Sequence, residues 1–311
     1  TTPAASQPPL LEKEGSNLAF DAHRMYYAEL LLVGLIWGCT YAMMALGLTL
    51  VYGLLRILHV AQATVFTLGA YVGLLVANYT GSMAVAFVAG AVSAGVLGPL
   101  IFRFIYQPIL DRPPFVALVA SIGVLIAMED GFRLLFGPYG LSFAHNTWFT
   151  TTYSVAGMTV NLVQVSMVVA AIVLLSAFAL FATRTRAGVA WRATVSDPPM
   201  AESFGVSVTG VRYTSFLIAS VLAGIAGVLV GLLNNLVEPG MGSVIAYKGL
   251  AIIVLGGLGS VAGTLVASLA LGVVESFGTV FLDKLLDRDA IAFLFLIIVL
   301  MIRPQGLLGK R

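Results

Sequence analysis

The sequence predicts an all-α protein that crosses a membrane several times. Hydrophobic residues make up 59% of the 311 residues and charged residues only 10%, whereas soluble domains carry about 25% charged residues. The mean hydropathy is +1.01. Strands are excluded, because an open sheet leaves backbone groups unsatisfied in lipid and the alternating pattern of a membrane barrel is absent. We therefore expect a polytopic transmembrane helix bundle.

The first part of the chain differs in composition from the rest. Residues 1–27 are polar and rich in Pro, Ser and Glu, and they lack the basic start, apolar core and small-residue cleavage site of a signal peptide. Such a composition is typical of a disordered tail. Residues 28–311 are expected to form a single transmembrane domain.

Nine apolar stretches follow one another along this domain. They lie at about 28–55, 60–78, 83–105, 114–136, 161–183, 211–235, 242–258, 261–279 and 289–302. A helix needs roughly 20 residues to span the hydrocarbon. Most of the stretches reach that length, but the seventh and the ninth are short. The prediction is therefore of about eight to nine membrane segments, some of them broken helices.

Charged residues in the connections predict the orientation. The 184–210 loop and the 103–112 loop are basic, and so is the C-terminus, which places all three on the cytoplasmic side. The 137–160 loop contains no Lys or Arg and is expected outside. The start of the chain has two readings: nine full spans put the tail outside, whereas a broken first or second segment puts it inside.

Two interruptions within apolar sequence predict helix breaks. Four glycines within Val254–Gly263 weaken a helix there, and Arg56, His59 and Gln62 interrupt the sequence around 56–62. Transporters place substrate at broken helices near the bilayer midplane, although each break could instead be a loop at the membrane surface, and for Arg56 we favour the loop. The candidate residues of a solute path are His59, Gln62, Gly256, Gly257 and Gly259. The alternative for the first two is that they satisfy neighbouring backbone groups.

The 184–210 loop carries the signs of a short helix. Asp197 is a suitable N-cap, the prolines after it suit the first helical turn, and Gly205 suits the end. The helix would span about two turns, from Pro199 to Phe204. Because a helix this short is unstable alone in water, something must hold it. It is either a connector resting on its own bundle or a docking element for a cytoplasmic partner.

Charges inside apolar segments are expensive and often functional. Glu129, Asp130 and Arg133 are spaced so that all three can pair on one helix face. We favour a structural ion cluster over a substrate contact. Glu275 lies near the outer end of its segment, with no obvious partner.

Signatures of enzymatic sites are absent. No lysine follows a glycine loop in the manner of a Walker A motif, and no G-x-S-x-G elbow is present. The three histidines are far apart, so we expect no metal site, and Cys39 is the only cysteine. The glycines after residue 255 lack the βαβ context of a dinucleotide site.

Four stretches resemble signatures of the permeases of branched-chain amino-acid ABC transporters. The first is YAMMALGLTLVYGLLRILHVAQATVFTLGAY, Tyr41–Tyr71. The others are RTRAGVAWRATVSDPPMAESFGVSV, KGLAIIVLGGLGSVAGTLVASLALGVVES and RDAIAFLFLIIVLMIRPQGLLG. They occur in the order typical of the family, and the similarity covers 30–309.

This resemblance implies a multi-pass permease in the inner membrane of a bacterium, part of an ABC importer. Its partners would be a second permease, two cytoplasmic ATPases and an extracytoplasmic binding protein. The chain itself would be no enzyme and would hold no cofactor, because the ATPases bind ATP and Mg²⁺. The segment matching 197–205 would be the coupling helix. Its coupling residues would be Asp197, Pro199, Met200, Ala201, Glu202, Phe204 and Gly205.

The solutes of the family include branched-chain amino acids, urea, short amides and other small polar molecules. The sequence departs from the family at His59, where Asn is common, at Ala63, where Gly is common, and in the acidic pair Glu129–Asp130. The alternative function is a secondary transporter or channel driven by an ion gradient, with the Glu129, Asp130 and Arg133 cluster as its support.

Overall fold

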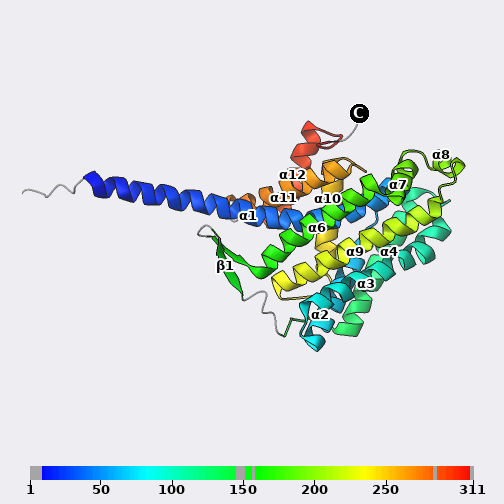
Figure 1. Ribbon diagram of the computed structural model, residues 1–311, viewed down its shortest axis with the longest axis horizontal. Coiled ribbons are helices and arrows are strands. Elements are labelled where there is room, and N and C mark those ends of the chain that lie inside the picture. The colour runs from blue at the N-terminus through cyan, green and yellow to red at the C-terminus, as the bar shows by residue number, and fades with distance from the viewer. Residues whose placement is uncertain (1–8, 145–150, 156–157, 283–285, 309–311) are drawn as a thin grey trace, which may run out of the picture.

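In a computed structural model of the protein, long helices pack into one bundle (Figure 1), as the sequence predicts. The structure describes residues 9–144, 151–155, 158–282 and 286–308. The elements are α1 (Pro9–Leu55), α2 (Gln62–Thr80), α3 (Met83–Ile101), a π-helical turn η1 (Phe102–Tyr106), a 3₁₀ turn η2 (Gln107–Ile109), α4 (Pro114–Phe136), β1 (Thr152–Val155), β2 (Met158–Asn161), α6 (Leu162–Arg184), α7 (Arg186–Ser196), α8 (Pro198–Ser203), α9 (Val208–Asn234), α10 (Met241–Gly256), α11 (Val261–Phe281) and α12 (Arg288–Ile302).

Each of the nine predicted apolar stretches corresponds to a helix. Within the described ranges, seven helices are long and apolar enough to cross a membrane. The two short stretches form α10, with 16 residues, and α12, with 15 residues. Polar side chains cap several helix starts. At the start of α6, for example, Asn161 and Gln164 form a reciprocal capping box. The chain is thus a multi-pass membrane protein.

Helix α1 begins much earlier than the composition indicated. The tail of residues 1–27 was predicted to be disordered, but residues from Pro9 onward already belong to the 47-residue helix α1. Pro9 suits a first helical position. The residues after it include strong helix formers such as Leu, Glu and Ala, and no further proline interrupts them before the apolar segment begins. Residues 1–8 lie outside the described part of the chain.

The bundle has two distinct ends. We call the end with α7, α8 and Arg56 the basic end, and the end with the β1–β2 hairpin the hairpin end. Antiparallel β1 and β2 pair from Thr152 opposite Asn161 to Val155 opposite Met158. Figure 1 shows α8 at one side of the molecule and β1 at the other.

Helix α1 runs from the hairpin end to the basic end. Near its start, Tyr27 stacks on Phe277 in the last turns of α11. Near its finish, Leu50 and Leu54 pack with Trp191 of α7. Because α1 crosses the bundle in full, its start lies at the end opposite α7 and α8.

Helix α9 lies at the centre of the core and packs against α1, α2 and α3. Its glycines let neighbouring backbones approach closely. A Cβ on Gly227, for example, would collide with the carbonyl oxygen of Phe66 in α2. Because lipid gives helices no hydrophobic drive to associate, such close contacts stabilise the bundle by van der Waals packing.

Both predicted helix breaks are present. The chain leaves α1 after Leu55, where Arg56 has a left-handed φ of 53°, and it leaves α10 after Gly256, where Gly257 and Gly259 have φ of 98° and 82°. The second break leads directly into α11, which packs against α10, whereas the first leads into α2, which packs mainly on α3 and α9. The two turns meet at the basic end, where Arg56 and Gly259 line one cavity of about 310 Å³. The location agrees with the loop that we favoured for Arg56.

The glycine break yields a test of the packing between α10 and α11. Gly263→Leu is expected to abolish the folded protein, because its Cβ would collide with the carbonyl oxygen of Gly256. Gly259→Leu is expected to be milder, since the residue has open space around it and the left-handed backbone costs about 1–2 kcal/mol. The measurement is the monodisperse yield in size-exclusion chromatography of detergent-solubilised protein.

The matched control is Gly123→Leu in α4, where an added Cβ meets nothing within 4 Å. Its yield should stay near that of the wild type. Equal yields for Gly263→Leu and Gly123→Leu would contradict the close contact of α10 with α11.

Candidate functional site

The basic end carries the short helix that the sequence predicted. Helix α8 covers Pro198–Ser203, within a residue of the predicted bounds. The Asp197 side chain accepts a hydrogen bond of 3.1 Å from the Met200 backbone N–H. Gly205 ends the turn with a φ of 81°. The N-cap, the prolines and the glycine therefore have the roles that the sequence indicated.

One face of α8 packs against the bundle, and the opposite face is exposed. Ala201 is buried, whereas the exposed fractions of Met200 and Phe204 are 56% and 79%. Pro199 and Glu202 are also exposed. The helix is thus anchored on its own bundle and still presents two large apolar side chains. Exposed apolar groups of this kind mark interaction sites more often than scattered single residues do.

Sequence analysis missed α7, the helix that supports α8. The Thr185 side chain caps it by accepting a hydrogen bond of 3.0 Å from the Gly188 N–H. Trp191 packs edge-on against Phe178 of α6, with ring centroids 6.1 Å apart. Gly188 permits this approach, because a Cβ there would collide with the backbone of α6. The sequence signal for α7 was the capping residue Thr185 with Gly188 three positions later, followed by Trp191 as one large apolar residue.

The packing of α7 connects α8 to three spanning helices. Trp191 shares a buried cluster with Leu54 of α1, Phe178 of α6 and Val211 of α9. The α7–α8 unit cannot tilt as a whole without displacing these side chains, because protein cores are close-packed. Helix α7 therefore links α8 by direct packing to the ends of α1, α6 and α9.

The glycine break lies beside this unit and is covered by the C-terminal segment. Leu307 N–H donates to the carbonyl oxygen of Leu255 at 2.7 Å, and Leu308 N–H donates to that of Gly256 at 3.3 Å. These bonds satisfy carbonyl groups that the end of α10 leaves without helical partners. Among the candidate path residues, Gly256 is in backbone contact with α11, and Gly257 and Gly259 form the turn.

His59 and Gln62, the other candidate path residues, are buried in the protein. His59 Nδ1 and the Tyr106 hydroxyl share a hydrogen bond of 2.6 Å, and Gln62 Nε2 donates to the carbonyl oxygen of Ala219 at 2.8 Å. His59 lies in the connection between α1 and α2, and burial lowers its pKa from 6.5 to about 3, so the ring is neutral at physiological pH. His59 Nε2 and Gln62 Oε1 are buried without a hydrogen-bond partner among the described residues, so a role of the two side chains in a solute path stays a prediction.

A second polar contact fixes the same connection. The Ala61 N–H donates to the Ser121 hydroxyl of α4 at 2.9 Å. The Phe216 ring of α9 lies against His59, with centroids 5.2 Å apart. The turn between α1 and α2 is therefore held by η1, α4 and α9 together.

The predicted ion cluster on α4 forms as the spacing indicated. Arg133 lies 2.6 Å from Glu129 and 2.9 Å from Asp130. Glu129 also accepts a hydrogen bond of 3.1 Å from Ser243 of α10. The cluster therefore links α4 to the start of α10 near the hairpin end.

Glu275 was described from the sequence as having no obvious partner, and this is wrong. Glu275 is fully buried. It accepts a hydrogen bond of 2.7 Å from the Tyr41 hydroxyl, lies 3.0 Å from Lys248 Nζ and accepts one of 2.9 Å from Arg288 Nε. Lys248 also lies 2.9 Å from Asp289. The partners come from α1, α10 and α12. Lys248, a charged residue within the apolar stretch of α10, was the sequence signal that could have indicated an ion pair with Glu275.

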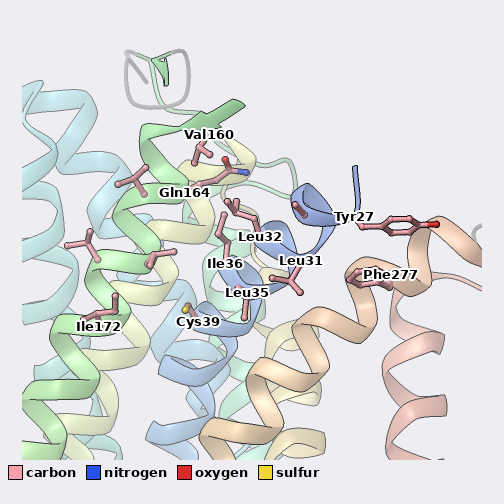
Figure 2. Close-up of a pocket in the computed structure, with 14 residues that line it drawn as sticks. Tyr27, Leu31, Leu32, Leu35, Ile36, Cys39, Val160, Gln164, Ile172 and Phe277 are labelled. Atoms are coloured by element: carbon pink, nitrogen blue, oxygen red, sulfur yellow. The ribbon is translucent and has the colours of Figure 1, made fainter. Parts of the chain in front are cut away.

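An apolar groove opens between α1 and α6 toward the hairpin end (Figure 2). It has a volume of about 940 Å³. Leu31, Leu35 and Ile36 line it from α1, and Ile172 lines it from α6 (Figure 2). Gln164 places an amide at its upper rim. The groove suits an apolar occupant at membrane depth.

Comparison with known proteins identifies relatives along nearly the whole chain. Residues 30–302 match the family described as "Branched-chain amino acid transport system / permease component". The chain is 30% identical over 305 residues to the high-affinity branched-chain amino acid transport system permease protein BraD of Pseudomonas aeruginosa, with 92% of this chain and 96% of the relative covered. It is 28% identical over 298 residues to LivH of Escherichia coli, with the same coverage.

A second kind of relative is more distant. LivM of Salmonella typhimurium, also a high-affinity branched-chain amino acid transport system permease protein, is 28% identical over 305 residues, with 86% of this chain and 67% of the relative covered. The family match begins within the first predicted membrane segment and ends with the last one. Because the match covers residues 30–302, the chain belongs to the family of permease components of branched-chain amino acid transport systems.

Proposed function

We propose that this chain is the permease subunit of an ATP-driven importer that moves branched-chain amino acids across the bacterial inner membrane. The observation that carries the proposal is α8, a capped two-turn helix that is anchored by Ala201 and exposes Met200 and Phe204 at the basic end. The similarity to BraD and LivH, which are branched-chain amino acid permeases, supports the solute class. It gives no support to urea or short amides.

Helix α8 would be the element that couples ATP hydrolysis to transport. Its exposed apolar side chains would enter a cleft of a cytoplasmic ATPase, and α7 would carry the resulting movement to α1, α6 and α9 through the cluster around Trp191. The flanking arginines, among them Arg184 and Arg186, are exposed and would favour an acidic rim on the partner. ATP and Mg²⁺ would be bound by the ATPases.

The assembly would contain a second permease, two ATPases and an extracytoplasmic binding protein. The similarity to both LivH and LivM supports a pair of related permeases. With the basic end in the cytoplasm, the start of α1 and the β1–β2 hairpin would lie outside, on the side of the binding protein. The second candidate, transport driven by an ion gradient, has no specific support, since the charges of Glu129, Asp130 and Arg133 pair with one another.

Replacement of the exposed side chains of α8 tests the coupling role. Met200→Asp and Phe204→Asp are expected to lower solute uptake at least tenfold with normal insertion, because a buried unpaired carboxylate disfavours docking. The measurement is uptake and ATP hydrolysis by the complete transporter in proteoliposomes. Tyr139→Asp, at an equally exposed aromatic residue outside α8, is the matched control. Wild-type uptake in both α8 variants would remove the coupling role.

The solute class is tested by competition. Cells that express the complete system are expected to accumulate radiolabelled leucine, and excess isoleucine or valine should compete for uptake, whereas urea and acetamide should not. Uptake should persist when a protonophore is added under conditions that maintain ATP. If uptake stops when the protonophore removes the ion gradient while ATP is maintained, the result would instead support the second candidate.

A further inference from the structure

Four charged side chains form a closed arrangement between α10, α11 and α12. Lys248 lies 3.0 Å from Glu275 and 2.9 Å from Asp289, and Arg288 donates to Glu275 at 2.9 Å. Arg288 and Asp289 are neighbours in the first turn of α12, so the chain itself closes the ring. We call these four residues the ion ring. Its signs alternate, and its net charge is zero.

The side chains around the ion ring come from α1. The Tyr41 hydroxyl donates to Glu275 at 2.7 Å, and the guanidinium of Arg288 lies over the Trp37 ring, 4.3 Å from its centroid. The ring therefore joins four helices in the half of the bundle toward the hairpin end. Charges in a membrane-spanning bundle are costly unless they are paired, and they mark functional positions more often than structural ones.

The ion ring divides into two halves that are each neutral. Lys248 and Glu275 belong to the body of the bundle, and their side chains are 6% and 0% exposed. Arg288 and Asp289 belong to α12, and theirs are 32% and 47% exposed. Loss of one member of a buried pair is strongly destabilising because it leaves an uncompensated charge. Separation of two neutral halves leaves no such charge in the bundle.

Helix α12 packs on the bundle along one face, where Phe295, Leu296 and Val299 lie against the cluster that contains Ala292. Among its described residues only Ile291 and Ala292 are buried, and Ile291 sits against Gly278 of α11. Large apolar side chains along the remaining length, such as Phe293 and Ile297, are exposed. Beyond the other end of α12, the backbone bonds of Leu307 and Leu308 tie the chain to the end of α10. The helix is thus tied beside the glycine break at one end and held by the ion ring at the other.

We propose that Arg288 and Asp289 are positioning residues for transport, and that the first turn of α12 is a latch that docks on Lys248 and Glu275 in one state of the cycle and leaves them in another. In the docked state the first turn of α12 is bonded to the bundle near the hairpin end, where α1, α10 and α11 meet it. In the undocked state α12 swings about its attachment at the basic end. The latch does not depend on which solute is moved.

Thermal unfolding of the detergent-solubilised chain tests the division into neutral halves. Arg288→Gln leaves one uncompensated negative charge, and a drop in Tm of about 10 °C is expected. The double variant Arg288→Gln/Asp289→Asn keeps the neutral Lys248–Glu275 pair and should be more stable than the single variant. If the double variant unfolds at a lower temperature than the single one, the ring acts as one inseparable unit and the latch is wrong.

Transport by the complete assembly in proteoliposomes tests the role of the latch. The double variant is expected to keep ATP hydrolysis within twofold of the wild type but to transport about fivefold less solute per ATP, because docking no longer accompanies the cycle. The conservative pair Arg288→Lys/Asp289→Glu should restore most of the ratio. An unchanged ratio in Arg288→Gln/Asp289→Asn would overturn the proposal.

The chain offers a matched control for these measurements. Asp130→Asn/Arg133→Gln also removes one positive and one negative charge near the hairpin end, from two side chains of one helix that are more than half exposed, and Glu129 keeps its hydrogen bond from Ser243. The amount of solute that this variant transports per ATP hydrolysed should equal that of the wild type. A fall as large as that of the latch variant would show a general effect of charge loss at this end, and it would overturn the specific role of α12.

Movement of α12 can be followed by cysteine labelling. In a Cys39→Ala background, Ala292→Cys places a thiol under the first turns of α12, where it is buried in the docked state. A membrane-impermeant thiol reagent is expected to label it several times faster during ATP turnover than at rest, whereas Ala267→Cys, buried in α11, should remain unlabelled in both. Equal labelling rates for Ala292→Cys at rest and in turnover would exclude the movement.

Discussion

Polar groups that are removed from water must find partners within the chain, and this constraint determines much of the bundle. The Lys248–Glu275 pair fixes α10 against α11, and Tyr41 adds α1 to the same contact. Ser121 receives the backbone N–H of Ala61 at the turn between α1 and α2. Because lipid offers neither hydrogen bonds nor a hydrophobic drive between helices, these few polar contacts decide which helices are neighbours, and small residues decide how closely they approach.

The order and approximate extent of the helices could be predicted because each depends on nearby sequence. Apolar length marks the spanning segments, and the Asp197 cap with its two prolines marks α8 to within one residue. The partners of Glu275 could not be predicted, because Tyr41 is 234 residues away in the sequence and only the packing of α1 on α11 brings the two together. The same holds for His59, whose hydrogen-bond partner Tyr106 lies on a π-helical turn that no local pattern indicates.

The two errors about helices have a common cause. Residues 9–27 and α7 both have polar compositions that are typical of tails and loops, yet both are helical. Composition measures whether a segment can bury an apolar surface, but a helix can also be extended from an adjoining one or supported by a single buried side chain. Helix α1 is an example of the first, because it continues without a break into the spanning segment. Helix α7 is an example of the second, because Trp191 anchors it.

The contact between Gly256 and Gly263 limits how α10 and α11 can move relative to each other. The two backbones touch there with no side chain between them, so a sliding movement would press carbonyl oxygens against one another. Farther along the same two helices, Lys248 pairs with Glu275. With two points of attachment, the glycine contact near α7 and this ion pair toward the hairpin end, α10 and α11 are expected to move as one rigid unit, so that a displacement at one end is carried to the other.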